Sequence, residues 1–441
     1  MRATALILVV AASAPQLALT QSAWEGPRTF DASEILTAAD RSGPHHSVGD
    51  RVPTEGFFYA FTLRTEFGDL ETVGLTLLKK RIAETGALVA LNEVSKTEVF
   101  IEAAGRSLVS LGKGAATVVT DPVGTARGLG GGIKRFGVNL GRRTQRVARN
   151  VTQDDDSEEE GTAGEAAANV ATAALGVNRA ARLWAQKLQV DPYSRNPVLQ
   201  SALLEVAKID AAGAIVTKVV IPIPPVVSIT STAGTLVWGQ DPEALRKTNE
   251  TGLKAIGVAD EIADAFFRND AFTLTEQTRF VAALEGVTAN GLADYVATAS
   301  EAGTPREGLF FVESVEMLQR QHSEGAVTSV LVDSRVIVAL SGNRAIALLP
   351  LDYLSWTESV AQAAAEIVER AKNELGASNL EMLLTGRASG RARNELQELG
   401  WALTERAAAA GSPARRGLAR SPRASSRMEG KTANWPSSLA L

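Results

Sequence analysis

Three short apolar runs lie close together in residues 327–349, VTSVLVDSRVIVALSGNRAIALL. Their β-type composition predicts strands at 327–332, 336–340 and 345–349. A turn is expected at Ser341-Gly342-Asn343-Arg344, between the last two strands. Helical and apolar stretches then alternate along the chain, at 357–375, 380–384, 389–399 and 401–404. This alternation predicts a small α/β layer that closes the C-terminal part of the fold.

Upstream of this layer, apolar side chains recur at helical spacing. Helices are expected across 242–321, where Asp241-Pro242-Glu243 is a favourable helix start with proline in the first turn. Two further helices, 164–189 and 197–212, are expected on either side of a turn at 191–197. Helices therefore dominate the middle of the chain.

The N-terminal part carries a different pattern. Residues 57–63, FFYAFTL, predict a buried strand, and residues 70–84 show helical spacing. The stretch 24–55 is punctuated by Gly-Pro and Val-Pro pairs, which predicts irregular structure. Taken with the rest of the chain, these patterns predict an α+β fold that is mostly helical, with short β-strands and a small C-terminal α/β layer.

The composition excludes several kinds of chemistry. The 441 residues include no Cys, which removes disulfides, thiolate metal sites and thiol nucleophiles. Three His residues leave little scope for imidazole acid–base work or metal binding. We therefore expect no cofactor and no metal. A net charge of −5 is small for this length and points to no particular partner.

The first residues resemble a secretory signal. Arg2 precedes an apolar run, Ala3 to Ala12, and small residues follow it, so cleavage is expected near residues 20–23. The run is too short to span a bilayer, and a buried N-terminal helix is the alternative. Export without Cys favours the bacterial envelope, which predicts a periplasmic or extracellular protein with no transmembrane span in the mature chain.

Changes in composition suggest the domain boundaries. An acidic run occupies 154–160, and an Ala-, Ser-, Arg- and Pro-rich stretch without periodicity ends the chain. The expected parts are a signal peptide (1–23), an N-terminal region (24–150), an acidic linker (151–163), a helical region (164–323), a small α/β region (324–405) and a disordered basic tail (406–441).

The N-terminal region contains a basic, glycine-rich segment, 105–149. Over 121–149, DPVGTARGLGGGIKRFGVNLGRRTQRVAR, a helical wheel gathers the apolar residues on one side and most basic residues on the other, with Arg143 the exception. Such a helix suits an anionic membrane surface. The expected contact residues are Arg127, Lys134, Arg135, Phe136, Arg142, Arg143 and Arg146. Seven glycines between Gly124 and Gly141 weaken a helix in water.

Other roles for this segment stay open. It can be an amphipathic helix pair on the protein's own core, with its basic face in water, or it can bind another envelope protein. Nucleic acid fits badly with export and with the lack of stacking aromatic residues. The leading hypothesis is an exported envelope protein that binds anionic lipid or a partner surface peripherally through 105–149.

A serine hydrolase is the competing hypothesis. Ser110-Leu111-Gly112-Lys113 is an S-x-x-K sequence, and Ser341-Gly342-Asn343 is S-x-N, in the order used by β-lactamase-type acyl-transferases and esterases. In such a site Lys113 would activate Ser110 as nucleophile. The third element, K-T-G on a strand, is missing. An extracytoplasmic esterase or amidase therefore rests on Ser110 and Lys113 alone.

Several motifs resemble an uncharacterised group of exported bacterial proteins. They are Ala90-Leu91-Asn92-Glu93, Val190 to Pro197, Leu384-Thr385-Gly386-Arg387 and Glu398-Leu399-Gly400-Trp401. The resemblance would cover residues 55 to 404, and the tail after Glu405 departs from it. It implies no activity, cofactor or catalytic residue.

Overall fold

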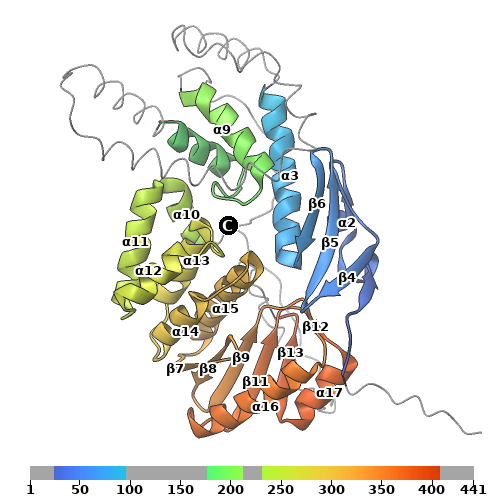
Figure 1. The fold of residues 1–441 in the computed structure, drawn as a ribbon, viewed down its shortest axis with the longest axis vertical. Helices are drawn as coiled ribbons and strands as arrows, with labels where there is room; N and C mark the ends of the chain where they lie inside the picture. The colour runs from blue at the N-terminus through green and yellow to red at the C-terminus, as the bar shows by residue number, and fades with distance from the viewer. Residues whose placement is uncertain (1–23, 96–175, 212–230, 408–441) are drawn as a thin grey trace, which may run out of the picture. The chain divides into compact units, whose positions relative to one another are not determined.

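The computed structural model describes residues 24–95, 176–211 and 231–407 (Figure 1). Within them the expected α+β fold is confirmed, with an antiparallel sheet, a set of helices and a mixed sheet following one another along the chain. The proposed signal peptide, the 105–149 segment and the acidic linker lie outside these ranges, as do residues 408–441 of the expected tail. In the described ranges, none of the helices combines the length and the apolar character that a membrane crossing requires.

The N-terminal sheet is antiparallel throughout and runs β1-β4-β5-β3-β2, with β6 also paired to β5. Its strands are β1 (Thr29–Asp31), β2 (Ser42–Gly43), β3 (His46–Val48), β4 (Arg51–Glu55), β5 (Phe58–Thr65) and β6 (Gly68–Val73). Alternate residues of β5, Tyr59, Phe61 and Leu63, are buried on one face. The expected strand at 57–63 is thus confirmed, although it begins one residue later and ends two residues later than expected.

Two expectations for this region are wrong. Residues 24–55 are not irregular, because they form four strands and two short helices, α1 (Ala32–Ile35) and α2 (Ala38–Arg41). Residues 70–73 belong to β6, and the long helix α3 (Leu75–Ser95) begins only after Gly74. Gly74 has a φ of +105°, a left-handed conformation that breaks the strand before the helix starts.

The middle of the described chain is helical, as expected. A helix at 176–187 is followed by α9 (Pro197–Ala211), α10 (Ser231–Gly239), α11 (Pro242–Ala255), α12 (Asp260–Arg268), α13 (Leu274–Glu285), α14 (Leu292–Ala299) and α15 (Pro305–Glu324). Asp241 caps α11 by accepting from the Glu243 and Ala244 amides, with Pro242 in the first turn. The expected helix start at this position is confirmed.

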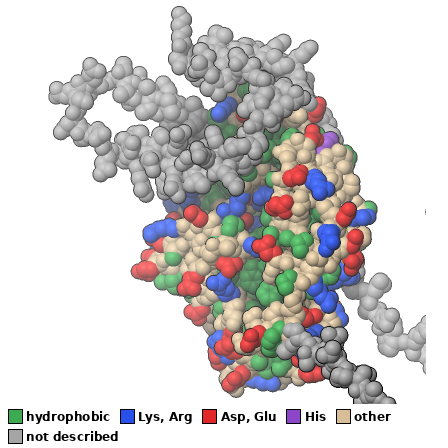
Figure 2. Space-filling view, turned by 45° about the vertical axis from the view of Figure 1, so that its right-hand side comes forward, with side chains coloured by type: hydrophobic (Ala, Val, Ile, Leu, Met, Phe, Trp, Pro, Cys, Tyr) green, Lys and Arg blue, Asp and Glu red, His purple; other side chains and the backbone are tan. Residues whose placement is uncertain are grey.

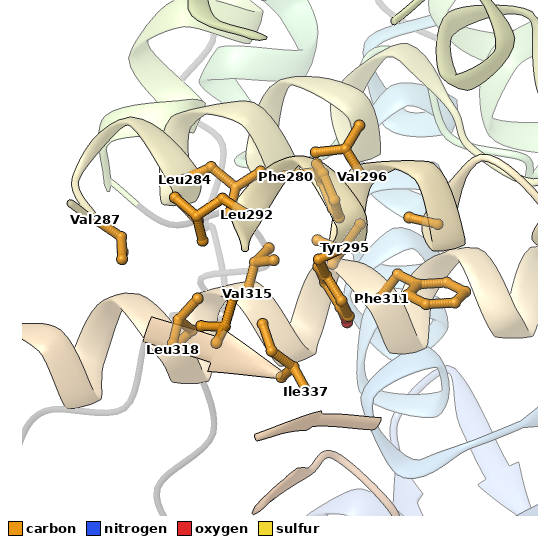
Figure 3. Close-up of a cluster of buried hydrophobic side chains, with 14 of the residues drawn as sticks. Phe280, Leu284, Val287, Leu292, Tyr295, Val296, Phe311, Val315, Leu318 and Ile337 are labelled. Atoms are coloured by element: carbon orange, nitrogen blue, oxygen red, sulfur yellow. The ribbon is translucent and has the colours of Figure 1, made fainter. Parts of the chain in front are cut away.

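Helices α13, α14 and α15 share a core of aromatic and aliphatic side chains (Figure 3). Phe280 and Tyr295 stack with ring centroids 6.1 Å apart, and Tyr295 meets Phe311 edge-on at 5.5 Å. Ile337 extends this core onto the neighbouring sheet. The helices therefore pack directly on one face of the C-terminal layer.

The C-terminal sheet runs β13-β11-β9-β8-β7, with β7, β8 and β9 antiparallel and β9, β11 and β13 parallel. Its elements are β7 (Ser329–Asp333), β8 (Val336–Ser341), β9 (Arg344–Leu349), α16 (Glu358–Asn373), β11 (Asn379–Leu384), α17 (Gly390–Glu398) and β13 (Trp401–Glu405). All the elements expected from 327 to 404 are present. A two-residue parallel pair, β10 (Tyr353–Leu354) with β12 (Arg387–Ala388), is additional.

Both faces of this sheet are buried. Ile337, Ala339 and Ile346 face the core shared with the helices, whereas Val338, Ala345 and Ala347 face the core that contains α16 and α17 residues. A strand covered on both faces needs apolar residues at successive positions. This explains the continuous apolar runs of 327–349.

Candidate functional site

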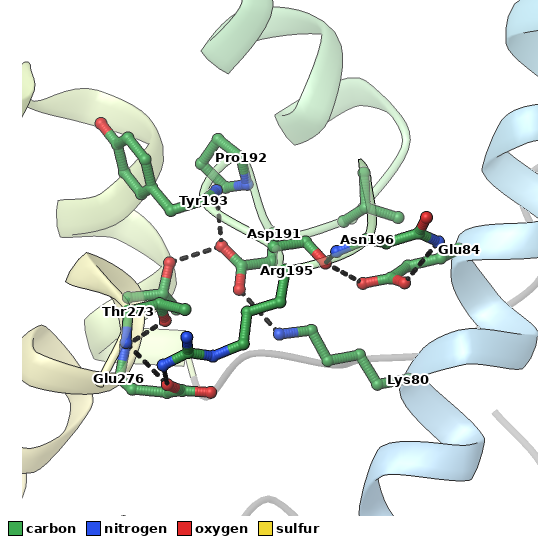
Figure 4. Close-up of polar contacts among 12 residues, drawn as sticks. Lys80, Glu84, Asp191, Pro192, Tyr193, Arg195, Asn196, Thr273 and Glu276 are labelled. Atoms are coloured by element: carbon green, nitrogen blue, oxygen red, sulfur yellow. Dashed lines mark hydrogen bonds and ion pairs between the residues drawn. The ribbon is translucent and has the colours of Figure 1, made fainter. Parts of the chain in front are cut away.

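Polar side chains from α3, the 190–197 turn and α13 converge in a buried cluster (Figure 4). We call it the base network, and its members are Lys80, Arg81, Glu84, Asp191, Ser194, Asn196 and Thr275. Positions 80, 81 and 84 share one side of α3 because residues three and four apart are neighbours on a helix. The turn brings in Asp191, Ser194 and Asn196.

Asp191 is the centre of one half of the base network. Its carboxylate accepts from Lys80 Nζ at 2.8 Å, from the Tyr193 amide at 2.9 Å and from Thr275 Oγ1. Burial alone would raise the pKa of this carboxyl, but the Lys80 ammonium and the hydrogen bonds outweigh burial and hold the pKa below its usual value. Asp191 is therefore a buried anion with a full set of donors.

Glu84 is the centre of the other half and is 1% exposed. It pairs with Arg81 Nη1 and accepts from Ser194 Oγ, and from Asn196 Nδ2 at 3.0 Å. The Asn196 Oδ1 atom accepts from the Val198 and Leu199 amides and so caps α9, which begins at Pro197. Glu84 thereby connects α3 to the start of α9.

The network has the chemistry of a scaffold. Ser194 Oγ donates to Glu84 and accepts from Arg81 and from the Asn196 amide, which uses the full capacity of a hydroxyl. Both carboxylates are already matched by cations, so they suit neither a metal ion nor general base catalysis. The arrangement fixes the relative positions of α3, the 190–197 turn and α13.

An apolar cluster continues this scaffold along α3. Leu88, Leu91 and Val94 near its C-terminal end pack with Trp184 and Leu188 after the 96–175 gap, and with the α9 residues Leu199, Leu203 and Val206. The two described ends of the 96–175 segment, Ser95 and residue 176, therefore belong to elements of one packed layer. The base network and this cluster hold that layer together.

A further buried carboxylate, that of Asp352, joins the N-terminal sheet to the C-terminal layer. Asp352 Oδ2 accepts from the Tyr59 and Leu75 amides, both at 3.0 Å, so it binds the start of α3. Burial raises the pKa of Asp352 to about 6, against the opposing effect of those hydrogen bonds. The loop that carries Asp352 is in turn held by Gly386, whose Cα faces the Asp352 carbonyl.

The residues expected to bind an anionic surface, Arg127, Lys134, Arg135, Phe136, Arg142, Arg143 and Arg146, lie outside the described residues, as do Ser110 and Lys113. In the S-x-N sequence, Ser341 ends β8 and Asn343 lies in the turn between β8 and β9. The Asn343 side chain donates to Ser378 Oγ at 2.8 Å, and its carbonyl accepts from the Ser378 and Asn379 amides. These polar groups hold the turn against the start of β11.

The motifs behind the resemblance have structural roles. The 190–197 turn forms half of the base network, and Leu384 to Arg387 supports the Asp352 loop. Gly400, at a φ of +92°, lets the chain turn from α17 into β13, where Trp401 is buried. The chain matches no family model, and searches of curated proteins and of solved structures found no match to it.

Proposed function

We propose that this protein is an exported bacterial envelope protein that binds anionic membrane surfaces peripherally through residues 105–149. The observation that carries the proposal is charge segregation. This segment holds nine Lys and Arg residues against one Asp, whereas the rest of the chain holds 36 against 49 Asp and Glu. An acidic protein that carries a strongly basic, amphipathic segment fits selective contact with anionic lipid.

The described surface supports the contrast. Figure 2 shows Lys and Arg side chains interspersed with Asp and Glu over the described part of the face that it presents. Thirteen ion pairs of Lys or Arg among the described residues, such as Arg279–Glu316 and Arg370–Asp333, neutralise many of the cations locally. The unbalanced positive charge is therefore concentrated in 105–149 and the basic tail.

The base network also supports the proposal. Binding through a segment that leaves and re-enters one fixed layer costs less ordering entropy than binding through a free tail. Lys80–Asp191 and the Glu84 contacts fix that layer on either side of the 96–175 segment. They would hold the binding segment's ends at a constant separation while it contacts a surface.

Co-sedimentation with vesicles tests the proposal. Full-length protein is mixed with phosphatidylglycerol-containing or purely zwitterionic vesicles, at low and at high salt. A basic side chain near an anionic surface contributes about 1 kcal/mol, so the triple variant R135Q/R142Q/R146Q is expected to bind about 100-fold more weakly. Binding should fall with salt because surface charges are screened.

A charge-matched variant is the control. R246Q/K247Q/K254Q removes three exposed cations from α11 and is expected to bind like the wild type. Equal binding to zwitterionic vesicles, binding that salt does not weaken, or equal losses in the two triple variants would each contradict the proposal. Absence of vesicle binding would also contradict it and would leave a protein partner as the next candidate.

A further inference from the structure

Within the described part of the chain, Arg182 is a buried cation that forms no ion pair. It projects from the helix at 176–187, is 8% exposed, and its Nε atom has no hydrogen-bond partner. Among the residues that the structure describes, no carboxylate forms an ion pair with it. A buried guanidinium left without an anion is strongly unfavourable. Its position therefore calls for a negatively charged group that the described residues do not supply.

Tyr193 lies beside Arg182, and its hydroxyl interacts with the Arg182 guanidinium. The Tyr193 Oη atom is buried, and none of the described residues accepts a hydrogen bond from it. Burial raises the pKa of the phenol and the adjacent guanidinium lowers it, so the hydroxyl keeps its proton and remains a donor at neutral pH. In Figure 4 the Tyr193 ring points away from Lys80 and Glu84, so the hydroxyl is separate from the base network.

Two acidic groups that act electrostatically on Tyr193, Asp241 and Asp191, are already committed to other partners. Asp241 accepts from the Glu243 and Ala244 amides as the cap of α11, and these bonds together with the more distant Arg182 charge hold its pKa low. Asp191 is matched by Lys80 and Thr275. Both carboxylates are ionised, so the surroundings of Arg182 favour a ligand with a single negative charge over a doubly charged one.

We propose that Arg182 and Tyr193 bind a singly charged oxyanion group, of the kind found in phosphodiesters and carboxylates. The guanidinium offers parallel N–H donors that match two oxygens of such a group, and the Tyr193 hydroxyl offers a third donor. This site is built from described residues and does not rest on the membrane proposal.

Anion titration of the full-length protein tests the site. Dimethyl phosphate and acetate are each titrated at constant ionic strength against chloride, and the melting temperature is followed, since a ligand that binds only the folded state raises it. The wild type is expected to show a saturable rise with at least one of the two anions. The R182Q variant should lose the rise, and Y193F should need a several-fold higher concentration.

The R179Q variant is the matched control because Arg179 lies on the same helix and is exposed. It should respond like the wild type. A wild-type melting temperature that depends on neither anion, or an equal rise in R182Q, would overturn the proposal. Should R182Q fail to fold, R182K keeps the charge without the planar fork, and an unchanged response in both R182K and Y193F would overturn it equally.

Two further arms identify the source of the oxyanion. A response to dimethyl phosphate, with weaker binding of R182Q than of R179Q to phosphatidylglycerol vesicles, would assign the site to a lipid headgroup. A response to dimethyl phosphate without that difference would assign it to a soluble phosphodiester. A response to acetate alone would assign it to a carboxylate ligand.

Discussion

The buried pair Lys80–Asp191 should contribute far more to stability than an exposed pair of similar geometry. Asp191→Asn keeps the shape of the side chain but removes its charge, and it turns the group facing Lys80 Nζ at 2.8 Å into a weak acceptor or a competing donor. The Asp191 side chain is 1% exposed and that of Lys80 is 19% exposed. Removing one partner of such a pair costs about 3–5 kcal/mol of unfolding free energy.

The exposed pair Arg268–Asp264 provides the control. Its side chains are 78% and 64% exposed, and exposed pairs contribute about 0–1 kcal/mol. Urea unfolding at pH 7, followed by tryptophan fluorescence, should therefore show a large fall in unfolding free energy for D191N and little change for D264N. The double variant K80M/D191N should be more stable than the sum of the two single losses predicts, because it leaves no unpaired buried charge.

Two results would show that the buried pair does not stabilise the fold in this way. The first is a loss in D191N no larger than that in D264N, which would mean that Asp191 is well solvated. The second is additivity of K80M and D191N, which would mean that the two charges do not interact. Either result would also remove the base network as the rigid anchor of the 96–175 segment.

Two further predictions concern the Asp352 loop. A methyl group at Gly386 would lie 1.9 Å from the Asp352 carbonyl oxygen, so the G386A variant should lower the unfolding free energy by about 1–3 kcal/mol in the same urea assay. The G390A variant is the control, because a methyl group at Gly390 would meet nothing within 4 Å. It should leave the unfolding free energy unchanged or raise it by about 0.4–1 kcal/mol. The pKa of Asp352 is raised from 3.8 to about 6, so the ionised form of this side chain disfavours folding. The unfolding free energy of the wild type should therefore fall as pH rises from about 4 to about 7. Asp352 should account for up to about 3 kcal/mol of this fall. D352N retains an acceptor for the Tyr59 and Leu75 amides, and its unfolding free energy should lack that fall; an equal pH dependence in both proteins would contradict the assignment.

The C-terminal layer could be predicted almost completely from the sequence. Its strands are covered on both faces, so each reads as an uninterrupted apolar run, and the turn at Gly342 separates two of them clearly. Of the N-terminal sheet only β5 could be predicted, because β1 to β4 are only two to five residues long. Residues Leu70 and Val73 are spaced as on a helix, and only the left-handed Gly74 separates β6 from α3.

The candidate sites depend on contacts that no local pattern reveals. Lys80 and Asp191 are 111 positions apart, and a Lys on a helix is normally solvated. The 190–197 turn was recognisable as a turn, but its burial against α3 and α13 is a tertiary property. Arg182 likewise lies on a predicted helix, and only its burial distinguishes it from the exposed Arg179.

Hydrogen–deuterium exchange of the full-length protein, with and without phosphatidylglycerol vesicles at low salt, tests whether residues 105–149 contact anionic lipid. Vesicles should slow exchange of the amides in 105–149 and leave those of α13 and α15 unchanged, with the effect absent on zwitterionic vesicles. Equal exchange rates across 105–149 with and without anionic vesicles would contradict this contact.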